Sequence, residues 1–223
     1  MATLDLEEQE QISALQHWWN QNGNLVTWVA VGVASVVVGY QGWQWYQRSQ
    51  STQASAAYAA VQTTLAERDA KKAREAAGEL IEKFGGSVYA GMGALLSARA
   101  QVEAGDLKSA RAQLAWAAEN ARDEELRDLA RLRLAGVMVD EKSYDEALKL
   151  LEKQPQGAYA ARFADLRGVI FAMQDKRNEA KAAYQTALSL LDGRKPGDGP
   201  SAAATAAFRE MVQLKLESLG QTL

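Results

Sequence analysis

Cysteine is absent from this chain of 223 residues, and histidine and proline are scarce, with one and three copies. Without cysteine the protein cannot form disulfides, thiolate metal sites or a cysteine-linked lipid anchor. The one histidine, His17, lies beside two tryptophans, and no nucleophile motif, phosphate-binding glycine loop or metal-site histidine spacing occurs. We therefore expect a protein that is not an enzyme and that uses neither a metal nor another cofactor.

Charged side chains are missing from a long N-terminal stretch. No Asp, Glu, Lys or Arg occurs between Glu10 and Arg48, and residues 25–45 read LVTWVAVGVASVVVGYQGWQW. A helix of this length spans about 30 Å, the thickness of a bilayer's hydrocarbon core, and aromatic residues flank both ends. A cleaved signal peptide is the main alternative, but such peptides begin with basic residues and have a shorter apolar run. We predict an acidic tail over 1–24, a transmembrane helix over 25–47 and a folded domain over 48–223.

The domain over 48–223 is nearly neutral, with 25 basic and 24 acidic residues. Such a balance gives no positive field for nucleic acid, so we expect no nucleic-acid partner. The residues are rich in Ala, Leu, Glu, Lys and Arg and show no strand-like alternation, which predicts an all-α fold. Turn signals divide this region into predicted helices at 50–69, 70–84, 88–104, 107–121, 123–140, 144–153, 157–174, 177–192 and 202–219.

Three stretches repeat one pattern: GDLKSARAQLAWA at 105–117, KSYDEALKLLEKQ at 142–154 and DKRNEAKAAYQTA at 175–187. Their alanines Ala110, Ala147 and Ala180 are 37 and 33 residues apart, close to the tetratricopeptide period of about 34. An earlier pair has an ambiguous register, with Ala73 or Ala76 in this position. The pattern predicts a tetratricopeptide-like solenoid of helical pairs, closed by a C-terminal capping helix; a generic helical bundle is the alternative.

The order of these features, together with YAGMGALLSARAQVEAGDL, LAWAAENARDEELRDLARLRLA and DLRG at 165–168, resembles the YfgM family. This resemblance implies a single-pass protein of the Gram-negative inner membrane with a tetratricopeptide-like domain in the periplasm. It implies an ancillary subunit of the SecYEG translocon that works beside the chaperone PpiD. Exported polypeptides are a further candidate partner, which a concave binding surface of the domain would hold. The sequence itself favours the opposite orientation faintly, because Arg48 is the only basic residue near either end of the predicted span.

Two surfaces are candidates for partner contacts. In stacked helical pairs the first helix of each pair lines the concave face, and its inward positions form what we term the inward strip. These positions are Met92, Leu95, Arg99, Val102, Leu129, Leu132, Val139, Arg162, Asp165, Val169 and Met173. The strip is either an open groove for extended or helical segments, or core covered by the C-terminal helix.

The second candidate surface is a stripe of small residues in the predicted membrane helix, Gly32, Ser35 and Gly39. Small side chains let two membrane helices approach closely. This stripe supports an alternative function, a passive scaffold that docks through its anchor and organises an envelope complex.

Overall fold

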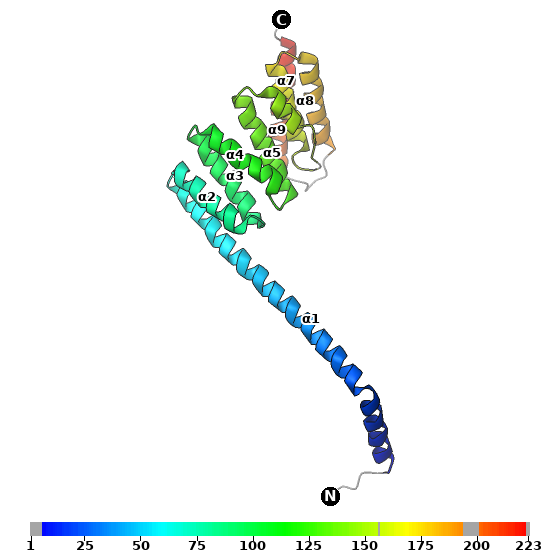
Figure 1. The fold of residues 1–223 in the computed structure, drawn as a ribbon. Helices are drawn as coiled ribbons and strands as arrows, with labels where there is room; N and C mark the ends of the chain where they lie inside the picture. Colours follow the sequence, from blue (N-terminus) through cyan, green and yellow to red (C-terminus); the bar gives the residue numbers. More distant parts are fainter. Residues whose placement is uncertain (1–5, 156, 194–200, 222–223) are drawn as a thin grey trace. The chain divides into compact units, whose positions relative to one another are not determined.

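The computed structural model describes residues 6–155, 157–193 and 201–221, and these residues form helices without any strand (Figure 1). The all-α prediction is confirmed. The chain divides into two compact units, Met1–Thr52 and Gln53–Leu223. The helices are α1 (Leu6–Ala66), α2 (Ala70–Phe84), α3 (Val88–Glu103), α4 (Leu107–Asn120), α5 (Glu124–Asp140), α6 (Tyr144–Leu150), α7 (Ala160–Met173), α8 (Arg177–Asp192) and α9 (Ala202–Gln221).

Helix α1 is much longer than the predicted membrane span. It is one helix up to Ala66, and no proline, which would interrupt its hydrogen bonds, occurs within it. The helix predicted over 50–69 is therefore the last part of α1. Apolar side chains of the first unit are widely exposed; Trp28, Val36 and Trp45 are 71%, 72% and 73% exposed. The helix contains an 18-residue window of mean hydropathy 1.6, so its length and composition are sufficient to cross a membrane.

In each of four helical pairs, a turn of the same geometry joins the first helix to the second. Each turn has one residue with positive φ: Arg68 (56°), Gly105 (78°), Lys142 (61°) and Asp175 (57°). Five residues later the second helix of each pair carries a fully buried alanine: Ala73, Ala110, Ala147 and Ala180. The end of α1 thus pairs with α2, and the common spacing assigns the register of this first pair to Ala73 rather than Ala76.

The helix ends follow local rules. Asp69, Ser87, Asp106 and Asp123 each accept a hydrogen bond from the backbone amide three residues later, which caps α2, α3, α4 and α5.

Helix α6 ends three residues before its predicted end, and α7 begins three residues after its predicted start. Pro155 lies in the interval, and its ring prevents a helix from continuing through this position.

The second unit has its core between consecutive helices. One buried cluster joins α3, α4, α5, α6 and α7 through Leu114, Leu134, Leu151 and Phe163. A second joins the end of α1 to α2 and α3, and a third joins α7, α8 and α9. Helix α9 buries Val212 completely in this third cluster and packs mainly on α8. It therefore covers the last pair, as the predicted capping helix should.

Candidate interaction surface

The inward strip lies on α3, α5 and α7, the first helices of their pairs, and its side chains differ in burial. Three are buried (Leu95, Val139 and Asp165), four are partly buried (Met92, Leu129, Leu132 and Val169) and four are exposed (Arg99, Val102, Arg162 and Met173). The buried and partly buried leucines and Val139 all belong to the central core cluster or pack against it. The exposed members are therefore the ones that a partner could reach directly.

A cleft of about 480 Å³ lies between α3 and α5. Its lining residues are Ala98, Arg99, Val102, Glu103, Leu114, Arg133, Gly136, Val137 and Asp140. Two of them, Arg99 and Val102, belong to the inward strip. The sequence reasoning missed the α5 side of the cleft, although Arg133, Gly136 and Asp140 follow Leu129 at steps of four, three and four residues. This spacing is the signal that one face of a helix gives, so extending the strip along α5 would have found them.

The floor and the rim of the cleft differ in chemistry. Ala98, Leu114, Gly136 and Val137 form an apolar floor. The exposed residues of the rim are Val102 and the four charged residues Arg99, Glu103, Arg133 and Asp140. Arg99 donates from Nε to Glu103 Oε1 at 2.7 Å, so these two charges are matched within α3. A cleft of this kind can hold an apolar side chain while polar groups at its edge orient the segment that carries it.

The α7 part of the strip is covered by α9. Lys215 Nζ donates to both carboxylate oxygens of Asp165, at 2.8 and 2.9 Å. The Arg162 guanidinium lies 4.9 Å from the centre of the Phe208 ring, a cation–π distance. Helix α9 thus covers Asp165 and contacts Arg162, which stays exposed, whereas Arg99 and Val102 of the strip line the α3–α5 cleft.

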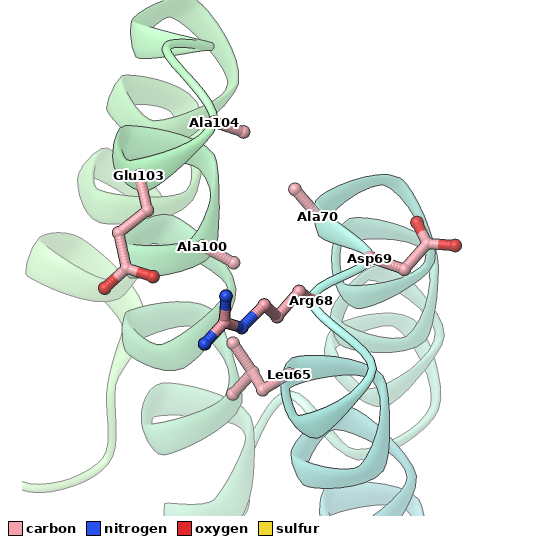
Figure 2. A pocket seen from close by; sticks show the side chains of 7 residues that line it. All are labelled: Leu65, Arg68, Asp69, Ala70, Ala100, Glu103 and Ala104. Carbon is pink, nitrogen blue, oxygen red and sulfur yellow. The ribbon is translucent and has the colours of Figure 1, made fainter.

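A second hollow, of about 400 Å³, lies between the α1–α2 turn and the C-terminal end of α3 (Figure 2). Figure 2 shows the Arg68 side chain extending from the turn toward Ala100 and Glu103 on α3. Gln101 Nε2 donates to the Ala70 carbonyl oxygen at 2.6 Å and ties the same two segments together. Charged side chains occupy much of this hollow, so it offers less apolar surface than the α3–α5 cleft.

The small-residue stripe of α1 has no packing partner in the first unit. A Cβ atom added to Gly32 or Gly39 would meet no atom within 4 Å, and Ser35 Oγ donates to the Val31 carbonyl oxygen at 2.8 Å. Helix docking through this stripe remains a prediction. Among the described residues, no three His, Asp or Glu side chains come together as a metal site requires.

Comparisons with known proteins agree with the architecture. Residues 16–221 match the model of a tetratricopeptide repeat-like domain. A protein of Neisseria gonorrhoeae named ancillary SecYEG translocon subunit is 28% identical over 219 residues, covering 96% of this chain and 98% of the relative. Its namesake in Escherichia coli is 29% identical over 213 residues, covering 95% and 96%.

A solved structure supports the fold alone. The crystal structure of BtubC (BKLC) from P. vanneervenii gives a TM-score of 0.50 at 14% identity, covering 76% of this chain and 82% of that one. The sequence relatives confirm the resemblance to the YfgM family that the N-terminal span and the repeats had suggested. With its family model matching from residue 16 to residue 221, the chain belongs to the tetratricopeptide repeat-like domain family.

Proposed function

We propose that this protein is a non-catalytic interaction module, anchored in the inner membrane by α1, that works beside the Sec translocon. The names of its relatives and the long apolar helix support this role. In this proposal Gln53–Leu223 faces the periplasm, where it contacts SecYEG, the chaperone PpiD and newly exported polypeptides, which it helps to hand over or protect. The orientation is tested by adding protease to spheroplasts: digestion of the domain supports it, and protection while a periplasmic control is cut contradicts it.

The observation that carries the proposal is the open cleft between α3 and α5. Its apolar floor offers a place for side chains of a segment that has not yet folded, and its volume of about 480 Å³ accepts side chains of different shape. No described helix lies over Val102, which is 38% exposed. An exposed apolar residue at the mouth of an apolar cleft is suited to contact with a partner.

A pair of matched variants on α3 tests this role. Val102→Glu places a charge at the cleft, whereas Val88→Glu places it at the first residue of the same helix, outside the cleft. The two valines are 38% and 39% exposed, so the substitutions should disturb folding to a similar, small extent. We expect Val102→Glu to lower capture of exported polypeptides by about tenfold and Val88→Glu to leave it unchanged.

Crosslinking in living cells identifies the partner. Because the chain contains no cysteine, one introduced at position 102 gives a single attachment point for a photoreactive group. Crosslinks from position 102 to exported polypeptides, absent from position 88, support the proposal. Equal crosslinking from both positions contradicts a role for the cleft.

The uncovered stripe of Gly32, Ser35 and Gly39 favours a second candidate, a scaffold that docks in a membrane complex through α1. Replacing residues 25–47 with an unrelated membrane helix distinguishes the scaffold from the module that binds through its cleft. A scaffold docked through its anchor loses its complex after this exchange. A protein that acts through the α3–α5 cleft retains crosslinks from position 102.

A further inference from the structure

Arg133 is the one arginine in the lining of the α3–α5 cleft that has no acidic partner among the described residues. Its Nη1 donates to the Leu95 carbonyl oxygen, but at 3.4 Å, near the long limit of a hydrogen bond. Its neighbour on α5, Arg131, is held by Asp128 Oδ1 at 2.6 Å. The folded chain thus leaves the charge of Arg133 available for an external group.

Arg133 is an exposed residue of the cleft lining, and its guanidinium is only partly desolvated. Partial desolvation lowers the pKa of its guanidinium; Tyr159 opposes this shift, and the positive charge of Arg99 adds to it. Arg99 is matched by Glu103, so its contribution is partly compensated. A cation that is partly desolvated and has no carboxylate partner gains an ion pair when a ligand supplies a carboxylate, and such groups are frequent at binding sites.

Two acids line the cleft: Glu103 pairs with Arg99, and Asp140 does not fill this role either. Asp140 lies seven residues after Arg133, two turns further along α5, which is about 10 Å in a helix. No ion pair joins these two residues in the structure. Between them the apolar floor, including Gly136 and Val137, remains available.

We infer that the cleft recognises an acidic side chain adjacent to a large apolar side chain within an internal stretch of a partner polypeptide. The apolar side chain enters the cleft, and the carboxylate pairs with the planar guanidinium of Arg133, which can donate two parallel hydrogen bonds. This inference rests on the proposed function and narrows it, because it names which segments of an unfolded polypeptide bind.

Fluorescent peptides test the inference on the full chain in nanodiscs of neutral phosphatidylcholine, which does not attract charged peptides. Three peptides in a Gly/Ser background carry leucine next to Glu, Gln or Lys, and blocked ends make the Glu side chain the only carboxylate. We expect the Glu peptide to bind about three- to tenfold more tightly than the Gln peptide, and the Lys peptide to bind most weakly. Arg133→Gln should remove the difference between the Glu and Gln peptides.

The matched control is Arg122→Gln, which removes an exposed arginine outside the cleft and should preserve the preference for Glu. Equal binding of all three peptides, blocked by Val102→Glu, overturns the inference but leaves the proposed function intact. No binding of any peptide overturns both. Because the comparison of peptides uses the unmodified protein, the result stands even if Arg133→Gln fails to fold.

Discussion

The α3–α5 part and the α7 part of the inward strip have the same repeat positions and opposite surroundings. Between α3 and α5 a cleft is open to a partner, whereas α9 packs over α7 at Arg162 and Asp165. The difference comes from α9, which buries Val212 in the third core cluster and places Lys215 against Asp165, 50 residues away in the chain. A repeat pattern therefore locates the face that can bind, and contacts from outside the repeats decide which part of it is free.

Two ion pairs on this strip illustrate the difference in energetic terms. Arg99–Glu103 and Lys215–Asp165 have nearly equal lengths, 2.7 and 2.8 Å. The side chains of the first are 69% and 62% exposed, and those of the second 30% and 12%. Since water screens exposed charges, the first pair contributes little to stability, whereas breaking the second leaves a poorly hydrated charge.

The largest effect is expected from Gly168→Ala in the covered part. A Cβ atom added to Gly168 would lie 2.5 Å from Cε1 of the Tyr184 ring, which is itself buried between α7 and α8. One of the two helices must shift, so we expect the free energy of unfolding to fall by about 1–3 kcal/mol. Thermal unfolding of the full chain in detergent, followed by circular dichroism, measures the loss.

Gly136→Ala is the counterpart in the open part. A Cβ atom there would meet no atom within 4 Å, so only the higher helix propensity of alanine acts. We expect a gain of about 0.5–1 kcal/mol. Equal melting temperatures for the two variants would contradict the assignment of a tight α7–α8 contact and an open α5 face.

Lys215→Met is expected to act next most strongly, by loosening α9. The substitution keeps an apolar chain of similar length but leaves Asp165, which is 8% exposed, without its cation. We expect the opening of α9 to become easier by about 2 kcal/mol, which corresponds to amide exchange about 30-fold faster in this helix. Lys181→Met, at an exposed position of α8, is the control and should leave exchange in α9 unchanged.

Alkaline pH tests the same region through Tyr184. Burial, assisted by the negative charge of Asp165, raises the pKa of Tyr184 to about 12 from its ordinary value of 10.0. The folded state disfavours ionisation of the Tyr184 phenol. Its contribution to the free energy of unfolding is therefore fully present below pH 10 and is lost as the pH rises from 10 to 12. At about pH 11 we expect wild type to have lost about 1 kcal/mol more than Tyr184→Phe, relative to pH 9. Parallel losses in the two proteins would show that Tyr184 is not buried in solution.

Much of the fold could be predicted because its signals are local. The charge-free run, the turn residues and the alanine spacing each act within one or two helices, and the predicted helix ends lie within three residues of the observed ones from α2 onward. In the later pairs a small residue, Ala98, Ala135 or Gly168, lies 12 residues before the buried alanine. Val61 stands at this position before Ala73, so the sequence does not mark the register of the first pair. The turn at Arg68 resolves it through backbone geometry, which the identity of an arginine does not reveal.

The candidate site was less predictable. Periodicity placed Arg99 and Val102 at the cleft but could not separate them from Leu95, which is buried in the core. It also could not show that Arg133 lacks an acidic partner while Arg131 has one, since both lie on the same helix two residues apart. Which arginine finds a partner depends on the direction of each side chain in the packed structure, which repeat spacing does not specify.

The smallest effect is expected from Arg99→Gln, the open-side equivalent of Lys215→Met. Its partner Glu103 is 62% exposed and stays hydrated when the arginine is removed, so no buried charge results. We expect the free energy of unfolding to change by less than about 0.5 kcal/mol, in contrast to the loss on the covered side. Thermal unfolding of both variants under one set of conditions makes the comparison direct. A loss from Arg99→Gln as large as that from Lys215→Met would mean that the α3–α5 cleft is covered in solution and that water does not reach its rim.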